Sequence, residues 1–449
     1  MASRTKDMTQ GSPTKLILFF CLPILAGNIF QQLYSLVDTF VVGRVEGVTA
    51  LAAVSSAGWL DWTLLGLAMG LAQGFAIQVA QSFGAGDYDE LRQAVGQSLT
   101  LSALVVLLLE IVAQVLLRPV LTLLNTPPDT YELTCLYLRI IFGGLPVVMG
   151  FNLLAGFLRS VGNSRTPLIA MITAAVCNIA LDILFVAGFH WGVAGVGIAT
   201  VISQGLSCII CLVAVMRLPV LRVSVKDLRL TPDIAPRLMK LGLPIGFQNF
   251  IISIGGLVLQ GVVNAQGFIF MAGYSAASRL QGLIELAGTA LSAAVGTFTG
   301  QNYGARKLDR VKLGLRRSAQ IGTGMAIIVA AVVLIWGKDL LRLFIQDDPA
   351  IVEQVLTFGH RFLIFMGSGL FALYMLFVYR STLQGLGDTF LPMISGIVEL
   401  FMRIGSALLL PLFMGEWGIY LSEIMAWAGA AVLLIWGYYH RIRLLSQRM

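Results

Sequence analysis

Landmarks from the first half of the chain return in the second half in the same order, about 220 to 226 residues later. The pairs are Leu22-Pro23-Ile24 with Leu243-Pro244-Ile245, Ser82-Phe83-Gly84-Ala85 with Asn302-Tyr303-Gly304-Ala305, Val161-Gly162-Asn163 with Leu386-Gly387-Asp388, and Trp191-Gly192 with Trp417-Gly418. A duplication of this length predicts two similar halves. Membrane carriers built from repeats of the same orientation hold their site between the halves. The repeat therefore favours a transporter.

The composition places these halves in a membrane. Hydrophobic residues make up 57% of the 449 residues and charged residues only 12%, whereas soluble domains average about 25% charged residues. A helix needs roughly 20 apolar residues to span the hydrocarbon. Twelve segments are long enough: 15–42, 50–81, 94–118, 131–158, 166–188, 192–216, 236–262, 270–300, 315–336, 352–380, 389–412 and 417–439. We expect an all-α integral membrane protein with twelve transmembrane helices in two six-helix lobes related by the internal repeat.

The basic residues indicate how these helices are oriented. The net charge is +7, and most of the 30 Lys and Arg fall at the termini and in the even-numbered loops. The positive-inside rule places both termini in the cytoplasm, so the basic surplus reflects topology and does not indicate nucleic-acid binding. We expect an N-lobe over 1–217 with helices 1–6, a cytoplasmic linker over 218–235, and a C-lobe over 236–449 with helices 7–12. The first apolar segment contains Pro23 and Asp38 and is expected to remain as helix 1 instead of being cleaved as a signal.

Four polar side chains are expected to lie together inside the membrane. Asp38 lies near the outer end of helix 1, Asp182 near the outer end of helix 5, and Thr200 eight residues into helix 6. At ~1.5 Å per residue, all three lie roughly 8 to 12 Å inside the outer boundary. Asn178 precedes Asp182 by four residues and shares its helix face. A charged residue near the centre of a span costs at least ~2.5–3.5 kcal/mol on insertion scales, so such groups need a partner or a function.

The residues alone leave three interpretations of this cluster open. Two aspartates in a poorly solvated pocket suit proton binding and release. Two carboxylates, an amide carbonyl and a hydroxyl are also the oxygen ligands that a hard cation such as Na⁺ prefers. The third interpretation is a polar knot that only holds helices 1, 5 and 6 together. The presence of two aspartates, with Asn178 beside them, favours a role in ion coupling.

The other buried acids indicate less about function. Glu399 and Arg403 lie four residues apart on helix 11, in the order that favours an intrahelical ion pair. A structural role for this pair is favoured over coupling. Glu285 on helix 8 is expected either to pack inside the protein or to face the cavity and attract a cationic substrate. Both Glu285 and Glu399 are candidate cavity residues.

No pattern in the sequence favours an enzyme. The three histidines, His190, His360 and His440, show no metal-ligand spacing. A GxxxxGK[ST] phosphate loop is absent from the sequence. Cys208 and Cys211 form a CxxC inside a predicted span, without the βαβ context of a redox motif. We expect a secondary carrier that needs no cofactor and is driven by an ion gradient.

Several segments resemble the multidrug and toxic compound extrusion (MATE) transporters. They are Leu22-Pro23-Ile24, Gln31 through Gly43, Leu51-Ala52-Ala53-Val54, Gln81 through Gly86, Arg159 through Asn163, and Leu383 through Asp388. The resemblance covers essentially residues 14 to 440. It implies two six-helix lobes around a central cleft that exchange H⁺ or Na⁺ for amphipathic, often cationic, drugs.

The resemblance is to the prokaryotic branch related to the DNA-damage-inducible F protein, which places its cation site in the N-lobe. The residues that match that site are Asp38, Asn178, Asp182 and Thr200, and Gln31 and Tyr34 match polar cavity residues beside it. Pro23 matches the proline at which helix 1 is proposed to bend. Another branch carries a cation-binding glutamate early in helix 7, where this chain has Ile252. The resemblance therefore favours coupling in the N-lobe.

Two functional hypotheses follow from these patterns. The leading one is a monomeric multidrug exporter in the plasma membrane of a prokaryote, with both termini cytoplasmic, that exports small amphipathic molecules in exchange for H⁺ or Na⁺. The alternative is a flippase for a lipid-linked precursor or oligosaccharide. Its anionic pyrophosphate cargo would require a cavity lined by several Arg or Lys, whereas the four arginines within spans, Arg139, Arg279, Arg361 and Arg403, are balanced by acids.

Overall fold

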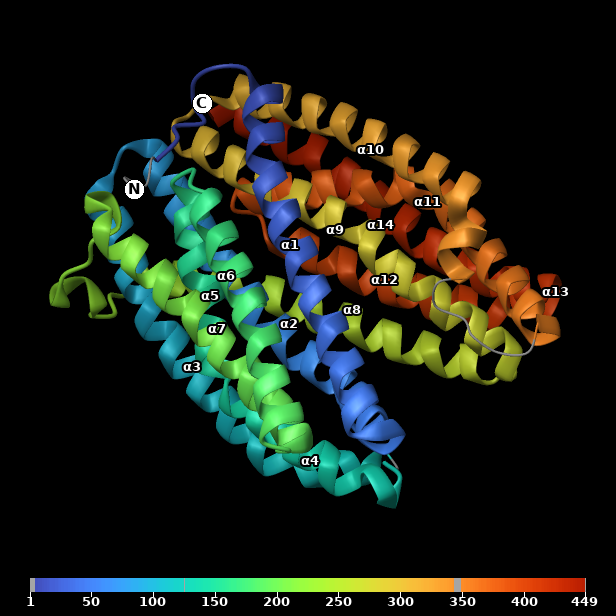
Figure 1. Ribbon diagram of the computed structural model, residues 1–449. Helices are drawn as coiled ribbons and strands as arrows, with labels where there is room; N and C mark the ends of the chain where they lie inside the picture. The colour runs from blue at the N-terminus through green and yellow to red at the C-terminus, as the bar shows by residue number, and fades with distance from the viewer. Residues whose placement is uncertain (1–4, 125, 343–348, 449) are drawn as a thin grey trace. The chain divides into compact units, whose positions relative to one another are not determined.

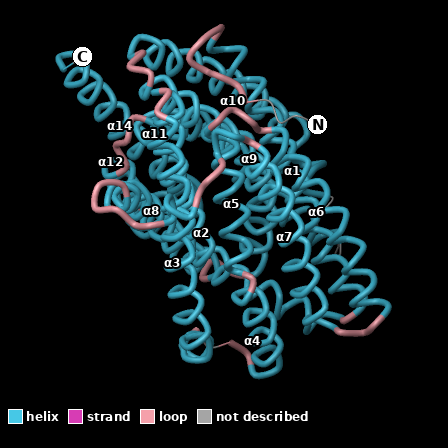
Figure 2. Tube along the Cα trace, turned by 90° about the vertical axis from the view of Figure 1, so that its left-hand side faces the viewer, coloured by secondary structure: helices cyan, strands magenta, loops and turns pink. Residues whose placement is uncertain are grey.

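The computed structural model describes residues 5–124, 126–342 and 349–448 (Figure 1). Throughout these ranges the regular structure is helical, and no strand occurs in them, as the tube in Figure 2 makes clear. The elements are α1 (Pro13–Val45), α2 (Gly47–Ala85), α3 (Tyr88–Leu123), α4 (Pro128–Gly143), α5 (Leu145–Ser160), α6 (Arg165–Asp182), η1 (Ile183–Gly188), α7 (Gly192–Arg217), η2 (Pro219–Leu221), η3 (Val225–Leu228), α8 (Ala235–Asn264), α9 (Phe268–Gly304), α10 (Leu308–Arg342), α11 (Pro349–Gly385), α12 (Phe390–Leu409), α13 (Pro411–Met414) and α14 (Glu416–Arg448).

The predicted number of membrane-spanning helices is confirmed. In the described ranges, eleven helical segments are long and apolar enough to cross a membrane. Counted as one span with a bend of 43°, the helices α4 and α5 make the twelfth. The bend lies at Gly144, and Pro146 follows at the start of α5, where a missing backbone N–H costs nothing. The chain is a multi-pass, all-α membrane protein.

The internal repeat is visible in the turns that end matching helices. After α5, the N–H of Gly162 donates to the carbonyl of Arg159 over 2.8 Å, and after α11 the N–H of Gly387 donates to that of Gln384, also over 2.8 Å. The two glycines have φ of 84° and 81°, a left-handed conformation that a side chain disfavours. The next residues, Asn163 and Asp388, each accept from a backbone N–H three positions on. Each half therefore begins its fifth span from the same turn.

The chain divides into two compact units. The first unit comprises the described part of Met1–Met8 together with Leu22–Gly246, and the second comprises Thr9–Cys21 and the described part of Phe247–Met449. The division falls within α1 just before Pro23 and within α8 two residues after Pro244. The lobe boundaries proposed from the sequence, 1–217, 218–235 and 236–449, stay a prediction.

Two glycines of α2, Gly70 and Gly74, bring two backbones together inside the first unit. A Cβ added to Gly70 would lie 2.6 Å from the Cα of Gly246, and one added to Gly74 would overlap the Cα of Gly242. Only glycine permits this approach, because real Cβ atoms do not come so near another backbone. These two glycines therefore serve the packing of α2 against the start of α8.

The segment after α7 is fastened to α3. The hydroxyl of Thr100 donates to the carbonyl of Leu228 over 2.8 Å, and Gln97 exchanges hydrogen bonds with Thr231. The fully buried Leu221 belongs to the hydrophobic core of the first unit. Arg237, at the start of α8, forms an ion pair of 2.6 Å with Glu90 at the start of α3. The sequence indicated a cytoplasmic linker here, and the structure shows that it packs on the first unit along much of its length.

Candidate functional site

Three helices of the first unit bring the predicted polar cluster together. The cluster residues are Asp38 on α1, Asn178 and Asp182 on α6, and Thr200 on α7. The hydroxyl of Thr200 donates to Oδ2 of Asp38 over 3.5 Å, and the carboxyl groups of Asp38 and Asp182 interact across the gap between their helices. The exposed fractions of Asp38, Asn178 and Asp182 are 8%, 1% and 0%. Counting residues along each helix predicted that Asp38, Asp182 and Thr200 lie at one depth, and the structure places them together.

Several atoms of this cluster are not satisfied by the protein. In the part of the chain that the structure describes, Oδ1 of Asp38, both carboxylate oxygens of Asp182 and both amide atoms of Asn178 are buried without a hydrogen-bond partner. Buried polar atoms are nearly always paired, since an unpaired one costs roughly 1–3 kcal/mol. The unpaired oxygens of the two acidic groups and the unpaired amide of Asn178 therefore form a set of atoms suited to a proton or a small hard cation.

A second layer of polar side chains surrounds the acids. The amide of Gln204 on α7 donates to the hydroxyl of Tyr34 over 3.0 Å, and Tyr34 also contacts the predicted cavity residue Gln31. Tyr137 on α4 lies within electrostatic range of both acids of the site. Asp61 on α2 also interacts with Tyr34 and has a buried Oδ1 without a hydrogen-bond partner among the described residues. The site therefore draws on five spans.

Sequence reasoning missed three of these neighbours. Gln204 follows Thr200 by four residues, so the shared helix face was a signal that could have identified it. Asp61 is an acid within the predicted span 50–81, but no residue of that span indicates a partner for it. Tyr137 gave no signal, because nothing in its spacing indicates that α4 turns this face toward α1.

The helix that carries the site changes its winding directly after Asp182. The segment Ile183–Gly188 is a π-helix, a rare form that occurs often at functional sites. Within it, Phe185 stacks on Trp191 with ring centroids 4.9 Å apart. The change of winding and the aromatic stack therefore both lie at the end of the helix next to Asp182.

The predicted acids of the second half have a different environment, inside the second unit. Glu399 is 4% exposed and accepts from Arg380 over 2.8 Å and from Arg403 over 3.2 Å. Arg403 also pairs with Glu423 of α14 at 3.0 Å. The predicted intrahelical pair of Glu399 and Arg403 is confirmed, and it forms part of a buried network of two arginines and two glutamates that links α11, α12 and α14.

Glu285 lies outside this chain of ion pairs. It accepts a hydrogen bond of 2.8 Å from Gln281, one turn earlier on α9. The assignment of Glu285 and Glu399 to a substrate cavity stays a prediction. Among the described residues, no group of three or more His, Cys, Asp or Glu side chains is arranged to hold a metal ion.

A family model described as MatE matches residues 23–184 and 244–409. The two matches begin at Pro23 and Pro244, the first pair of the internal repeat. The same model therefore describes both halves of the chain.

Proteins similar to this chain carry related descriptions. The probable multidrug resistance protein YpnP of Bacillus subtilis is 30% identical over 373 residues, which cover 80% of this chain and 81% of YpnP. The probable multidrug resistance protein YoeA of the same organism is 26% identical, over 97% of this chain and 95% of YoeA. The multidrug export protein MepA of Staphylococcus aureus strain MRSA252 is 25% identical, over 94% of this chain and 93% of MepA.

Solved structures share the fold at lower sequence identity. A MATE protein in complex with MaL6 superimposes with a TM-score of 0.92 at 23% identity, covering 99% of this chain and all of the other. The outward-facing conformation of a multidrug resistance MATE transporter of the MOP superfamily gives a TM-score of 0.91 at 23% identity, covering 98% and 99% of the two chains. With one family model matching both halves and relatives aligned over most of its length, the chain belongs to the MatE family of multidrug and toxic compound extrusion transporters.

Proposed function

We propose that the chain is a secondary active multidrug exporter that moves amphipathic, often cationic, compounds out of the cell in exchange for H⁺ or Na⁺. The observation that carries the proposal is the buried cluster of Asp38, Asn178, Asp182 and Thr200, whose two acids interact with each other and keep unpaired oxygens. The names of the relatives YpnP, YoeA and MepA support the drug substrates.

The chemistry of the cluster supports ion coupling. Two carboxylates that face each other in a buried site repel when both are charged, and a proton or Na⁺ between them removes that repulsion. A bound Na⁺ would be held by oxygens of Asp38, Asn178, Asp182 and Thr200, which are the hard donors that such an ion prefers. Occupancy of the site would draw α1 toward α6 and α7, and release of the ion would let them separate.

Coupling requires that the ion distinguish two conformations of the transporter. An ion that moves the population from 1:99 to 99:1 must bind the favoured state about 10⁴-fold more tightly. A pair of acids that is close in one state and separated in the other supplies such a difference, because Coulomb repulsion at this depth is screened little. A single exposed carboxylate would not supply such a difference in ion affinity.

Pro23 offers a place for the associated movement. It lacks the N–H that would bond to the carbonyl four residues earlier, which weakens α1 at this point. Asp38 lies fifteen residues further along the same helix, about 22 Å at ~1.5 Å per residue. A small change of the bend at Pro23 would therefore shift Asp38 relative to Asp182. Two similar structures describe a MATE protein in a bent and in a straight conformation.

The proposal includes the remaining parts of the transport cycle. The halves 1–217 and 236–449 act as lobes that alternate access, with the termini in the cytoplasm, and a single copy is sufficient. Gln31, Tyr34 and Glu285 contribute polar contacts to the substrate, whereas both oxygens of Glu399 are already held by arginines. This pairing also gives no support to the flippase alternative, because Arg380 and Arg403 are neutralised by glutamates.

The experiment is efflux of a fluorescent lipophilic cation from inverted vesicles, with pH and Na⁺ gradients imposed separately. Wild-type protein should respond to one of the two gradients, and Asp38→Asn should abolish that response while the protein stays in the membrane. Asp233→Asn is a matched control, because it makes the same chemical change at an exposed position of the linker. Gradient-driven efflux by Asp38→Asn at the wild-type rate would refute coupling at this cluster.

A further inference from the structure

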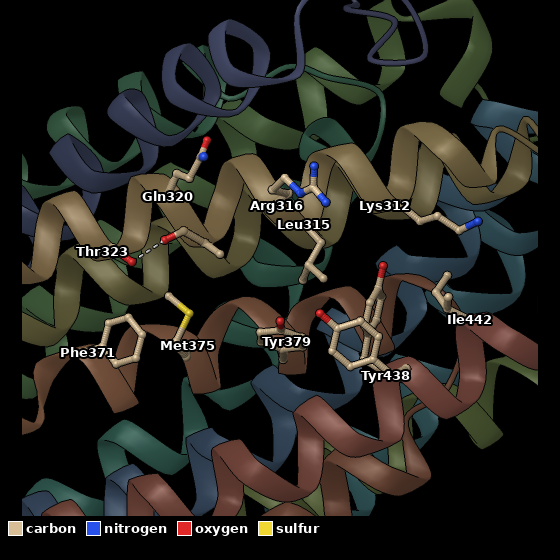
Figure 3. Close-up of a pocket in the computed structure, with 12 residues that line it drawn as sticks. Lys312, Leu315, Arg316, Gln320, Thr323, Phe371, Met375, Tyr379, Tyr438 and Ile442 are labelled. Atoms are coloured by element: carbon tan, nitrogen blue, oxygen red, sulfur yellow. Dashed lines mark hydrogen bonds between the residues drawn. The ribbon is translucent and has the colours of Figure 1, made fainter.

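A groove lies between α10, α11 and α14 of the second unit, and its lining includes none of the acids of α1 and α6 (Figure 3). Its volume is about 620 Å³, within the range of sites that hold drug-sized ligands. Phe371 and Met375 lie at one end, Tyr379 in the middle, and Tyr438, Ile442 and Lys312 at the other (Figure 3). Thr323 and Gln320 of α10 lie at the same end as Phe371 and Met375 (Figure 3), so the two ends differ in charge: one carries neutral side chains and the other a lysine.

The polar end of the groove is basic. Lys312 lines it from α10, Arg316 lies one turn further toward the middle (Figure 3), and the lining of the groove includes no Asp or Glu. In the ranges that the structure describes, the guanidinium of Arg316 forms no hydrogen bond or ion pair. Lys312 lies 3.5 Å from Asp309, whose carboxylate is 99% exposed, and an exposed pair of this kind contributes little. Both cations are therefore available to an anion.

Tyrosines line the groove from its middle to this end. Tyr379 and Tyr438 are 9% and 2% exposed and pack edge to face, with ring centroids 5.6 Å apart. Tyr439 packs edge to face on Tyr438 at 5.4 Å and is 60% exposed. The hydroxyl groups add hydrogen-bond donors beside the two cations. Fixed aromatic rings with polar tips are suited to the boundary between hydrocarbon and water.

The level of the groove in the membrane follows from the helix ends. Lys312 is four residues from the start of α10 and Tyr379 six residues from the end of α11. Trp436 on the same turn of α14 as Tyr439 is 63% exposed and stacks on His440. Exposed Trp and Tyr at one level mark the membrane interface. In the predicted topology this is the cytoplasmic interface, where anionic lipids attract basic residues.

We propose that this groove binds an anionic phospholipid, with the phosphate between Lys312, Arg316 and the tyrosine hydroxyls. The upper part of one acyl chain lies along Leu315, Met375 and Phe371. The match rests on the placement of the cations and tyrosines toward one end of the groove and of Met375 and Phe371 toward the other, which is the order of a phospholipid from headgroup to tail. A lipophilic cation fits poorly, because the two positive charges at the polar end repel it. The site is independent of the proposed ion coupling.

The test is lipid binding to the purified full-length protein, measured by native mass spectrometry with phosphatidylglycerol and with phosphatidylcholine. Wild-type protein should bind phosphatidylglycerol more tightly. Arg316→Gln should weaken that binding about fivefold, the equivalent of the ~1 kcal/mol that one basic residue contributes near an anionic surface. Arg317→Gln is the matched control, since it removes the same charge one residue along, outside the groove.

A second variant separates groove binding from general charge attraction. Ala319→Trp fills the groove from α10 without changing the charge, and it should reduce phosphatidylglycerol binding at least as much as Arg316→Gln. Equal effects of Arg316→Gln and Arg317→Gln would overturn the proposal, because attraction would then depend on net charge alone. Unchanged binding by Ala319→Trp, or equal wild-type affinity for the two lipids, would overturn it as well.

Discussion

Glu399 holds together the buried ion-pair network of the second unit, and its replacement provides a stringent test of that network. The carboxylate accepts from Arg380 on α11 and from Arg403 on α12, and the three side chains are 10% exposed or less. Glu399→Gln preserves the shape and removes the negative charge. Arg403 keeps Glu423, but Arg380 keeps only the hydroxyl of Ser395 and uncharged neighbours. One buried positive charge then has no carboxylate partner.

The expected cost follows from that uncompensated charge. Breaking a buried pair by removing one partner typically costs about 3–5 kcal/mol, most of it from the charge left behind. Replacing both partners by apolar residues of similar size is often neutral. The double variant Arg380→Met/Glu399→Met should therefore be more stable than Glu399→Gln, since Arg403 and Glu423 remain paired. A comparable change at the half-exposed pair of Arg361 and Glu416, Glu416→Gln, should cost only about 0.2–1 kcal/mol.

The assay is equilibrium unfolding of the purified proteins in mixed micelles with increasing sodium dodecyl sulfate, followed by loss of helical circular dichroism. Efflux is measured on the same variants. A loss of less than about 1 kcal/mol for Glu399→Gln, or a double variant less stable than the single one, would refute the reasoning from uncompensated charge. Loss of efflux at wild-type stability would instead assign Glu399 to the substrate cavity.

Three further variants test other parts of the structure. Gly74→Ala places a Cβ on the backbone of Gly242 and should destabilise the protein by about 1–3 kcal/mol in the same unfolding assay. Gln97→Ala removes the hydrogen bonds that fasten Thr231 to α3, and it should speed tryptic cleavage of the linker in limited proteolysis. Thr200→Val removes a hydroxyl that would ligate Na⁺. A bound proton would be carried by the aspartates and would not need this hydroxyl. The variant should therefore impair Na⁺-driven efflux more than H⁺-driven efflux, measured with each gradient separately.

Matched controls keep these outcomes interpretable. Gly324→Ala adds a Cβ where nothing lies within 4 Å and should leave stability nearly unchanged. Thr173→Val removes an exposed hydroxyl of α6 that bonds only within its own helix, and efflux should persist. An unchanged rate of tryptic cleavage in Gln97→Ala would contradict the packing of the linker on α3. Equal losses from Thr200→Val and Thr173→Val would argue against a cation ligand on α7.

Most of the architecture was accessible from sequence because it depends on local properties. Apolar length alone predicts the spans, and the structure has twelve when α4 and α5 count as one. The repeat of Gly162 and Gly387 was visible because each left-handed turn requires a residue without a side chain. The bend of 43° at Gly144 was not foreseen, since 131–158 reads as one continuous apolar run.

The candidate site was predicted to a useful extent for a similar reason. Depth along a helix follows from residue count, so Asp38, Asp182 and Thr200 were expected at one level, and the structure brings them together. Rotation about the helix axis does not follow from residue count. Tyr137 and Asp61 were consequently not assigned to the site, although both lie near its acids or their tyrosine neighbour.

The sequence by itself determined the membrane class, the number of spans, the repeat and the i, i+4 pair of Glu399 and Arg403, because each depends on neighbours within one helix. Only the tertiary structure decided that Arg380 and Glu423 complete the network. The same holds for the linker on α3 and the basic, tyrosine-lined groove between α10, α11 and α14. These features join residues far apart in the chain. Which helix faces meet depends on how the side chains of different helices pack. Residue spacing along one helix carries no information about that packing.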